Sequence, residues 1–367
     1  IVGTENNLGD ALWGKAISIS MFFCALLSPY AGGIADLLGA RKKMLFVFTA
    51  LCFLSVSSFS LLKKGMLIEG FLLVILANFS MEMAFVFYNS FIVFIEKDYG
   101  FGKISAIGFA AGYLGSVISL LMSLFLLERG LTNLIWPFCG AFFFLFSIPL
   151  IVTLPPERSI KTGVMSAAKK GLDELLKLVR KVLKDRNLKY FLLAYLFYED
   201  AINTVIVFSS IYASFTFGFG QAEIVQLYLS TQLSAMLGAF IIARFIESIG
   251  YKRTLSLSLV AWIIITITAA ISSEKWQFGL ACLTGGFFLG ILQASSRALF
   301  ATFIPKVEVS KYFGLYSLVG KSSSIIGPAS FGAISYLTGS QRIAAIFVST
   351  LFIFGLIVLG KVKEKSC

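Results

Sequence analysis

The sequence predicts an all-α polytopic membrane protein. Three observations predict it. The composition is 58% hydrophobic and only 14% charged, long apolar runs alternate with short polar loops, and the basic residues are concentrated in every second loop. The mean hydropathy of +0.89 agrees with a chain whose main solvent is lipid.

The composition excludes a water-exposed surface over most of the chain. Soluble domains carry about 25% charged residues, and a charge at mid-depth in a bilayer costs at least about 2.5 kcal/mol. In a soluble protein the net charge of +12 would suggest nucleic-acid binding. Because the basic residues lie in loops between apolar runs, we expect the lipid bilayer as their partner, and no nucleic acid.

Eleven apolar runs are long enough to cross a bilayer as helices, since a crossing takes about 20 residues. They cover residues 12–32, 44–62, 67–95, 104–127, 134–154, 190–217, 222–246, 254–272, 276–303, 311–337 and 341–360.

The distribution of Lys and Arg predicts the orientation. One set of alternate loops carries 22 basic residues, the opposite set carries six, and three lie inside spans. Because cytoplasmic loops are enriched in Lys and Arg, we expect the first set to be cytoplasmic. Trp13, Trp136 and Trp276 then fall near the outer ends of spans, where aromatic belts lie.

The longest loop, residues 155–189, contains a basic amphipathic segment. Apolar residues recur there with helical spacing, and basic residues cover the remaining positions; the apolar set is Leu172, Leu175, Leu176, Val179, Val182 and Leu183. The pattern predicts either a helix on the inner membrane surface or a linker helix packed on the bundle.

A short motif occurs twice. Gly32-x-x-x-Asp36-x-x-Gly39-Ala40-Arg41-Lys42 follows the first span, and Ala243-x-x-x-Glu247-x-x-Gly250-Tyr251-Lys252-Arg253 follows the second span after the long loop. The glycine suits a helix-ending turn, and the bases suit an anionic inner leaflet. The chain begins at Ile1, and the first copy lacks a preceding span, so we expect one absent N-terminal helix. The halves are then 1–154 and 190–367, and both ends of the full chain are cytoplasmic.

This motif resembles the signature between helices 2 and 3 of the major facilitator superfamily, whose fold has two six-helix halves. The resemblance implies that Gly32, Asp36, Gly39, Arg41 and Lys42 form a conformational switch that holds the halves together in one state and releases them in another. The second copy implies a weaker switch, with Glu247, Gly250, Lys252 and Arg253. Ala40 departs from the family, which often has a base there.

Further stretches are similar to the bacterial "unknown major facilitator" group, which is related to fungal autophagy-linked vacuolar amino-acid effluxers. They are Ala77-Asn78-Phe79-Ser80-Met81-Glu82, Val86-Phe87-Tyr88-Asn89, Gly112-Tyr113-Leu114-Gly115, Gln293-Ala294-Ser295-Ser296-Arg297, Phe313-Gly314-Leu315-Tyr316-Ser317 and Gly327-Pro328. Tyr198-Glu199-Asp200 also resembles the helix-7 segment of that group. The resemblance implies a transporter, with amino acids as the favoured solute.

Ionisable residues inside spans are candidates for substrate binding or coupling. Glu82, Glu199, Asp200 and Lys321 fall near mid-depth, and Arg297 lies closer to the cytoplasmic end. A zwitterion could bind with its ammonium near an acid and its carboxylate near Lys321. An acid could instead carry a coupling proton, the charges could form an internal pair such as Asp200 with Lys321, and Arg297 could simply snorkel.

Four polar neighbours could line a cavity or form interhelical hydrogen bonds: Asn78, Asn89, Asn203 and Gln293. Small residues at Gly286, Gly290, Ala294 and Ala298 indicate close helix packing. The chain has no His, and its five cysteines lack metal-ligand spacing, so we expect no metal site and no cofactor beyond a possible coupling proton or ion. The sequence contains no phosphate-binding loop and no evident nucleophile–base pair, so we do not expect an enzyme.

We therefore expect a secondary transporter of a small hydrophilic solute that works as a monomer in a bacterial inner membrane. Two alternatives stay open: an exporter of lipids, drugs or metals with the same fold, and a membrane receptor or assembly partner without flux.

Overall fold

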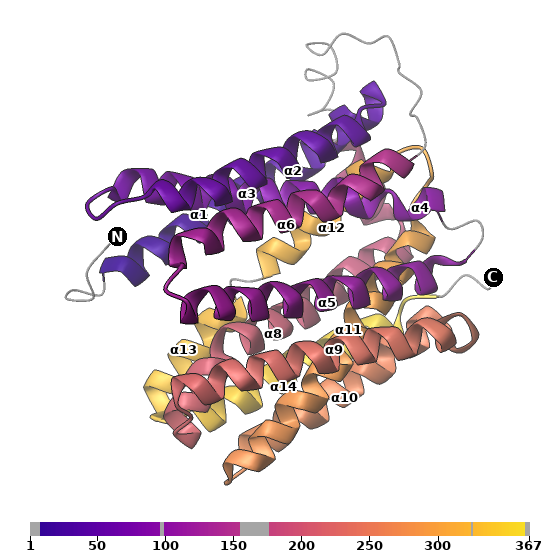
Figure 1. The fold of residues 1–367 in the computed structure, drawn as a ribbon. Helices are drawn as coiled ribbons and strands as arrows, with labels where there is room; N and C mark the ends of the chain where they lie inside the picture. Colours follow the sequence, from indigo (N-terminus) through magenta and orange to yellow (C-terminus); the bar gives the residue numbers. More distant parts are fainter. Residues whose placement is uncertain (1–7, 96–98, 155–175, 324–325, 364–367) are drawn as a thin grey trace. The chain divides into compact units, whose positions relative to one another are not determined.

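The computed structural model describes residues 8–95, 99–154, 176–323 and 326–363, and every regular element in these ranges is helical (Figure 1). The elements are α1 (Leu8–Leu38), α2 (Arg41–Ser58), η2 (Phe59–Leu61), α3 (Leu67–Ser90), α4 (Ile92–Ile95), α5 (Phe101–Glu128), α6 (Thr132–Thr153), α8 (Arg186–Phe217), α9 (Gln221–Ile249), α10 (Tyr251–Ile271), α11 (Lys275–Phe303), α12 (Val309–Ser323), α13 (Ile326–Thr338) and α14 (Gln341–Gly360).

Ten helices in the described ranges are long and apolar enough to cross a membrane, and they correspond to ten of the eleven predicted spans. The eleventh, residues 311–337, overlaps α12 and α13, and residues 324 and 325 between these helices lie outside the described residues. Gly327 and Pro328 lie in the first turn of α13, where proline is tolerated because the first amides of a helix have no partner within it.

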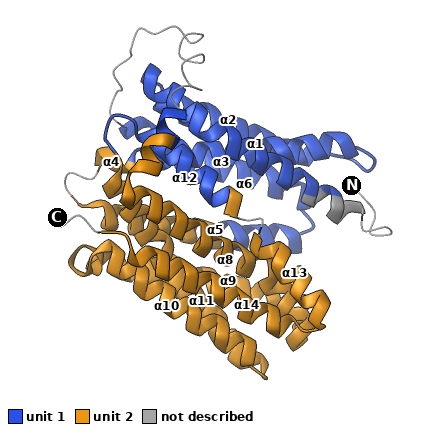
Figure 2. Cartoon of the chain, turned by 180° about the vertical axis from the view of Figure 1, so that it is seen from behind, with its two compact units in different colours: residues 1–91, 119–179, 305–321 blue, residues 92–118, 180–304, 322–367 orange. Residues whose placement is uncertain are grey.

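The described chain forms two compact units (Figure 2). Unit 1 contains residues 1–91, 119–179 and 305–321, and unit 2 contains residues 92–118, 180–304 and 322–367. In unit 1, α3 packs on α1 and α2, and α2 packs on α6. In unit 2, α11 packs on α9 and α10, and α14 packs on α8, α10 and α13. The predicted division into the halves 1–154 and 190–367 stays a prediction.

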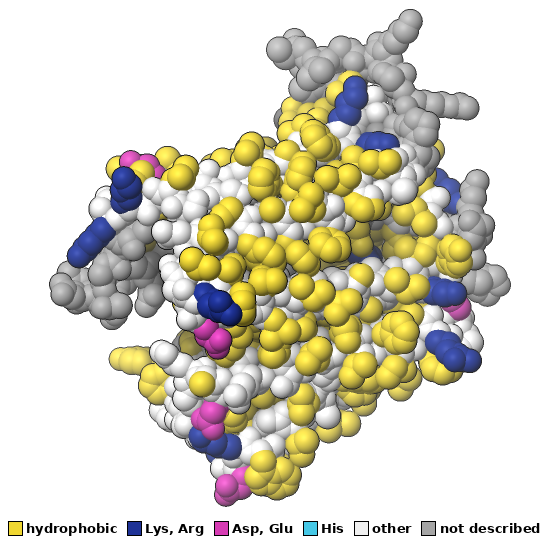
Figure 3. All heavy atoms as spheres, viewed as in Figure 1, with side chains coloured by type: hydrophobic (Ala, Val, Ile, Leu, Met, Phe, Trp, Pro, Cys, Tyr) yellow, Lys and Arg dark blue, Asp and Glu magenta, His cyan; other side chains and the backbone are white. Residues whose placement is uncertain are grey.

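The surface of each unit suits a lipid solvent. Large apolar side chains such as Phe22, Phe215 and Phe240 are exposed along the helices. On the face drawn in Figure 3, hydrophobic side chains cover the middle of the helices, and most charged side chains lie at helix ends. This placement keeps charges out of hydrocarbon, where they are costly.

The amphipathic loop segment is only partly described. Residues 176–184 are helical, whereas the predicted apolar positions Leu172 and Leu175 lie outside the described residues. Val182 is buried, together with Leu178, which the prediction did not include, and Leu176, Val179 and Leu183 are exposed. One apolar side of this helix, with Leu178 and Val182, is therefore buried against protein. A second apolar side, with Leu176, Val179 and Leu183, is exposed.

The pairing of α9 with α11 depends on glycines. A Cβ at Gly290 would collide with the backbone carbonyl of Ala235, and a Cβ at Gly238 would collide with that of Phe287. The sequence predicts this role for Gly290, and its reason is close backbone approach between membrane helices.

Replacing Gly290 by Ala should lower the melting temperature of the detergent-solubilised protein, because overpacking costs about 1–3 kcal/mol. Gly279 lies on the same helix, and a methyl group added there would meet no neighbouring atom within 4 Å. Gly279→Ala is therefore the matched control and should be neutral or stabilising. Equal melting temperatures for the two variants would contradict the packing role.

Candidate functional site

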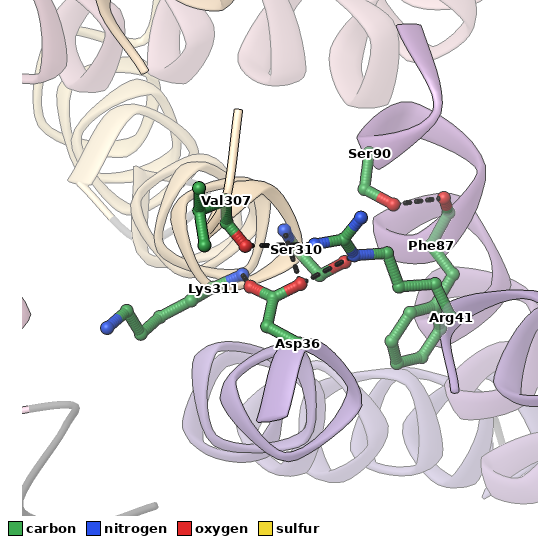
Figure 4. Close-up of polar contacts among 7 residues, drawn as sticks. All are labelled: Asp36, Arg41, Phe87, Ser90, Val307, Ser310 and Lys311. Carbon is green, nitrogen blue, oxygen red and sulfur yellow. Dashed lines mark hydrogen bonds and ion pairs between the residues drawn. The ribbon is translucent and has the colours of Figure 1, made fainter. Parts of the chain in front are cut away.

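Asp36 near the end of α1 accepts hydrogen bonds from the start of α12. Its Oδ1 accepts from the backbone N–H of Ser310 at 3.2 Å, and its Oδ2 accepts from that of Lys311 at 2.9 Å. Arg41 donates through Nε to the same carboxylate at 2.6 Å and through a second nitrogen to the carbonyl of Val307 at 3.0 Å (Figure 4). First-turn amides of a helix have no partner within it, and the positive helix end favours an anion. Asp36 therefore caps α12 in trans within unit 1.

Glu247 near the end of α9 does the same for α5 within unit 2. Its Oε1 accepts from the backbone N–H of Gly102 at 2.8 Å and of Lys103 at 3.1 Å. Its second oxygen accepts from the hydroxyl of Tyr251 at 2.5 Å. The two copies of the sequence motif thus build the same device: an acid at a helix end that caps the first turn of another helix.

Glycines place both acids. Gly39 and Gly250 follow the acids by three residues and have φ angles of 61° and 91°, in the left-handed region that glycine tolerates. Gly32 lies one turn before Asp36, and a Cβ there would collide with the carbonyl of Ser310. These positions end α1 and α9 and let α1 approach α12 closely.

The remaining bases of the motif serve other helix ends. Lys42 donates to the carbonyl of Leu154 at the end of α6, at 3.0 Å. Lys252 donates to the carbonyls of Gly360 and Val362, at 3.2 and 2.6 Å, where α14 ends. Cations at helix C-termini are stabilising, because unpaired carbonyls gather there. Arg253 is exposed.

Glu82 and Lys321 form an ion pair within unit 1. The ammonium of Lys321, in the last turn of α12, lies 2.5 Å from Oε1 of Glu82 on α3. Glu82 is buried, with 8% of its surface exposed, and 25% of the Lys321 side chain is exposed. Cys24 on α1 is buried beside both charges. The internal pair that the sequence suggested for Lys321 therefore forms with Glu82.

Asp200 caps a third helix. It is 1% exposed on α8, and its Oδ1 accepts from the backbone N–H of Gly327 in the first turn of α13, at 2.9 Å. A Cβ at Gly327 would lie 2.9 Å from that oxygen and would collide with the hydroxyl of Thr204. Glycine is therefore needed for α13 to reach the carboxylate.

Glu199, Gln293 and Arg297 lie in unit 2. The amide of Gln293 donates to Glu199 at 3.4 Å. Arg297 is buried and donates to the hydroxyl and the carbonyl of Ser105 on α5, at 2.9 and 2.8 Å. Its guanidinium also lies 4.3 Å from the ring centre of Phe109. Arg297 therefore joins α11 to α5 and does not extend to the surface.

The predicted polar neighbours differ in their contacts. Asn78 donates to the hydroxyl of Ser20 at 2.7 Å, which joins α3 to α1. Asn203 is partly buried on α8, one turn beyond Glu199. Asn89 lies next to the last residue of α3, within the span 67–95 that the sequence predicts.

Some residues at these sites were not predicted. Ser310, Lys311, Gly102 and Lys103 contribute backbone amides, which carry no side-chain signal in a sequence. Ser105 has a side-chain signal, but its partner Arg297 lies 192 residues away along the chain. Tyr251 lies only four residues after its partner Glu247, so helical spacing within the second motif copy could have predicted that contact. Among the described residues no group of three or more potential metal ligands occurs.

The family model described as "Vacuole effluxer Atg22 like" matches residues 15–100 and 96–366 of this chain. A relative from Bacillus subtilis (strain 168), described as the uncharacterized MFS-type transporter YxiO, is 29% identical over 377 residues, which cover 99% of this chain and 87% of that protein. Autophagy-related protein 22 of Saccharomyces cerevisiae (strain ATCC 204508 / S288c) is 25% identical over 410 residues, covering 95% of this chain and 77% of that protein.

Two solved structures share the fold. The human organic anion transporter MFSD10 has a TM-score of 0.74 at 18% identity, covering 95% of this chain and 83% of that chain. A variant of the E. coli fucose:proton symporter FucP has a TM-score of 0.74 at 15% identity, covering 98% of this chain and 95% of that chain. The described helices therefore adopt the major facilitator fold.

Removing the charge of one capping acid should expose only the helix start that it caps. In Asp36→Asn, the amides of Ser310 and Lys311 should exchange hydrogen ~10-fold faster or more, because hydrogen bonds to charged groups contribute about 1.5–3 kcal/mol. In Glu247→Gln, the amides of Gly102 and Lys103 should respond instead. Hydrogen exchange read by mass spectrometry measures both, and each variant is the control for the other. Equal acceleration at both helix starts in either variant would rule out local capping.

Proposed function

This chain belongs to the family described as vacuole effluxer Atg22 like, and from that premise we propose that it moves a small hydrophilic solute, with amino acids as the favoured class, by alternating access. The chain is an integral membrane protein with the fold of secondary transporters, and its function is transport and not catalysis. The solute class rests on the family and on the charges inside the spans.

The observation that carries the proposal is the Glu82–Lys321 ion pair. Two opposite charges lie together, Glu82 in a helix long enough to cross a membrane and Lys321 in the predicted span 311–337, and neither is fully buried. Separating them without new partners would leave an uncompensated charge, which costs about 3–5 kcal/mol in a buried pair. A zwitterion can replace both partners at once, its ammonium at Glu82 and its carboxylate at Lys321. The pair therefore selects solutes that carry both charges.

The two motif copies supply the conformational element of the proposal. Asp36 with Arg41 holds the start of α12, and Glu247 with Tyr251 holds the start of α5. We infer that these caps form in one state of the transport cycle and break in another. Lys42, Lys252 and Arg253 remain at the helix ends, where the charge asymmetry predicts the cytoplasmic side of a bacterial inner membrane. The transporter is proposed to act as a monomer.

Replacing Glu82 by Gln should strongly reduce transport of the solute across the membrane. The full chain, reconstituted in liposomes, is tested with a panel of amino acids for electrical currents and for uptake of labelled solute, with and without a pH gradient. We expect saturable transport of one amino-acid class in wild type and at least ~10-fold less in Glu82→Gln, since a charge-assisted contact is worth about 1.5–3 kcal/mol.

Glu223 provides the control for this change. It forms an exposed ion pair with Lys275 at 2.8 Å, so Glu223→Gln removes the same group from a surface pair and should leave transport intact. Silence of the folded wild type across the panel would exclude amino acids and favour the lipid, drug or metal exporter, or a receptor without flux.

Asp200 is proposed as the coupling group. The described residues give this buried carboxylate one hydrogen-bond donor in the α13 backbone and no cationic side chain, so taking up a proton would relieve the cost of its charge. Asp200→Asn should retain exchange of labelled solute between the two sides of the membrane but lose accumulation driven by a pH gradient, because Asn keeps an accepting oxygen for Gly327 and cannot titrate.

The matched control is Asp185→Asn, which changes the exposed acid that caps α8 through the amides of Asn187 and Leu188. This control variant should accumulate labelled solute in response to a pH gradient as the wild type does. Wild-type accumulation in Asp200→Asn would remove the coupling role, and loss of exchange together with accumulation would assign Asp200 to structure.

A further inference from the structure

A hollow with a basic lining lies where α9 ends, α10 begins and α14 ends, all within unit 2. Its volume is about 750 Å³. Lys252 and Arg253, in the first turn of α10, and Lys363, just beyond α14, line it, and none of the described residues that line it is acidic. The hollow is separate from Glu199, Asp200 and Arg297, which lie within the spans. We call it the basic hollow.

One of the three cations, Lys252, already forms hydrogen bonds with the protein that shape the hollow. Lys252 donates to the carbonyls of Gly360 and Val362, which holds the end of α14 against the start of α10. The backbone N–H of Lys363 donates to the side-chain oxygen of Asn187, and this hydrogen bond fixes the position of Lys363. The hollow therefore has a defined wall on the α14 side.

The other two cations remain available for an anion. Arg253 and Lys363 are exposed, and in the described chain no acidic side chain forms an ion pair with either. Helix α10 begins at Tyr251 without a side-chain cap on its N-cap residue, Gly250, so the positive end of its dipole adds to the field of the cations. Together these groups favour a phosphate, which guanidinium groups bind through paired hydrogen bonds.

The apolar surface beside the hollow identifies the source of that phosphate. Ile249 and Leu257 also line the hollow, and Leu257 is 62% exposed. From Leu257 a stripe of exposed apolar side chains continues along one side of α10, formed by Val260, Ile264, Ile267 and Ile271. At 1.5 Å per residue, Leu257 to Ile267 spans about 15 Å, which is half the ~30 Å hydrocarbon core. A headgroup in the hollow would thus place an acyl chain along α10 to the bilayer centre.

We propose that the basic hollow binds the phosphate headgroup of an anionic phospholipid in the leaflet that the charge asymmetry predicts to be cytoplasmic. Arg253 and Lys363 bind the phosphate, and the α10 stripe supports one acyl chain. Because Tyr251 in the same turn donates to Glu247, a bound lipid also steadies the helix end that caps α5. The site is independent of the transported solute.

The test uses the full chain in detergent, titrated with phosphatidylglycerol, with zwitterionic phosphatidylcholine and with inorganic phosphate at matched ionic strength. Bound lipid is counted by native mass spectrometry, and stability is followed by thermal unfolding. Phosphatidylglycerol should bind and raise the melting temperature of wild type more than phosphatidylcholine does. In Arg253→Gln/Lys363→Gln its affinity should fall ~10-fold or more, as each base near an anionic surface contributes about 1 kcal/mol.

The control variant is Lys43→Gln/Lys184→Gln. It removes the same charge from two exposed bases on the same predicted side, and Lys43 lies in the first turn of α2, the helix that follows the first motif copy. This control should keep wild-type lipid affinity, and the charge-preserving Arg253→Lys should keep most of it. An equal loss in the control would show diffuse attraction to lipid and overturn the proposal. An identical stabilisation by inorganic phosphate would overturn it in favour of a soluble anion.

Discussion

The constraint on which the structure depends is that backbone amides at a helix start need partners that lipid does not supply. Three acids provide such partners from a different helix: Asp36 for α12, Glu247 for α5 and Asp200 for α13. Each contact combines a hydrogen bond with the attraction between a carboxylate and the positive helix end. The positions of three helix starts thus depend on the charge of three side chains. Neutralising one of these carboxylates would weaken its hold on the helix start and leave the packing of the apolar helix faces in place.

The two motif copies use this device with different reinforcement. Asp36 has Arg41 as a cationic partner, and Arg41 also donates to the carbonyl of Val307. At the position equivalent to Ala40 the second copy has Tyr251, whose neutral hydroxyl donates to Glu247. The Arg41–Asp36 contact adds the attraction between two opposite charges to its hydrogen bond, so the cap on α12 should be the more stable of the two. Family resemblance ranked the copies in the same order, and these contacts give a physical reason for it.

The sequence predicted the fold and the chemical types at the site better than it predicted the partners. Apolar runs identified ten crossing helices because burial in lipid imposes a length and a composition that can be read directly. The motif offsets placed the acids and the turn glycines, because one helix turn and one left-handed residue have fixed spacings. Periodicity holds no information on which distant helix start receives Asp36, or that Lys321 pairs with Glu82, which is 239 residues away.

The pairing of Glu82 with Lys321 bears on the selectivity of the proposed transport. Glu82 is neutralised by Lys321 before any solute arrives, so a solute with a single charge would bind one member of the pair and strand the other. Stranding a buried charge costs more than a single new contact returns, whereas a zwitterion satisfies both members. Asp200 differs because its described partner is a backbone amide, and a proton can neutralise it without removing a cation from another carboxylate. In the proposed function one acid exchanges partners with a solute and another exchanges protons, and this assignment follows from what surrounds each carboxylate and not from its depth in the membrane.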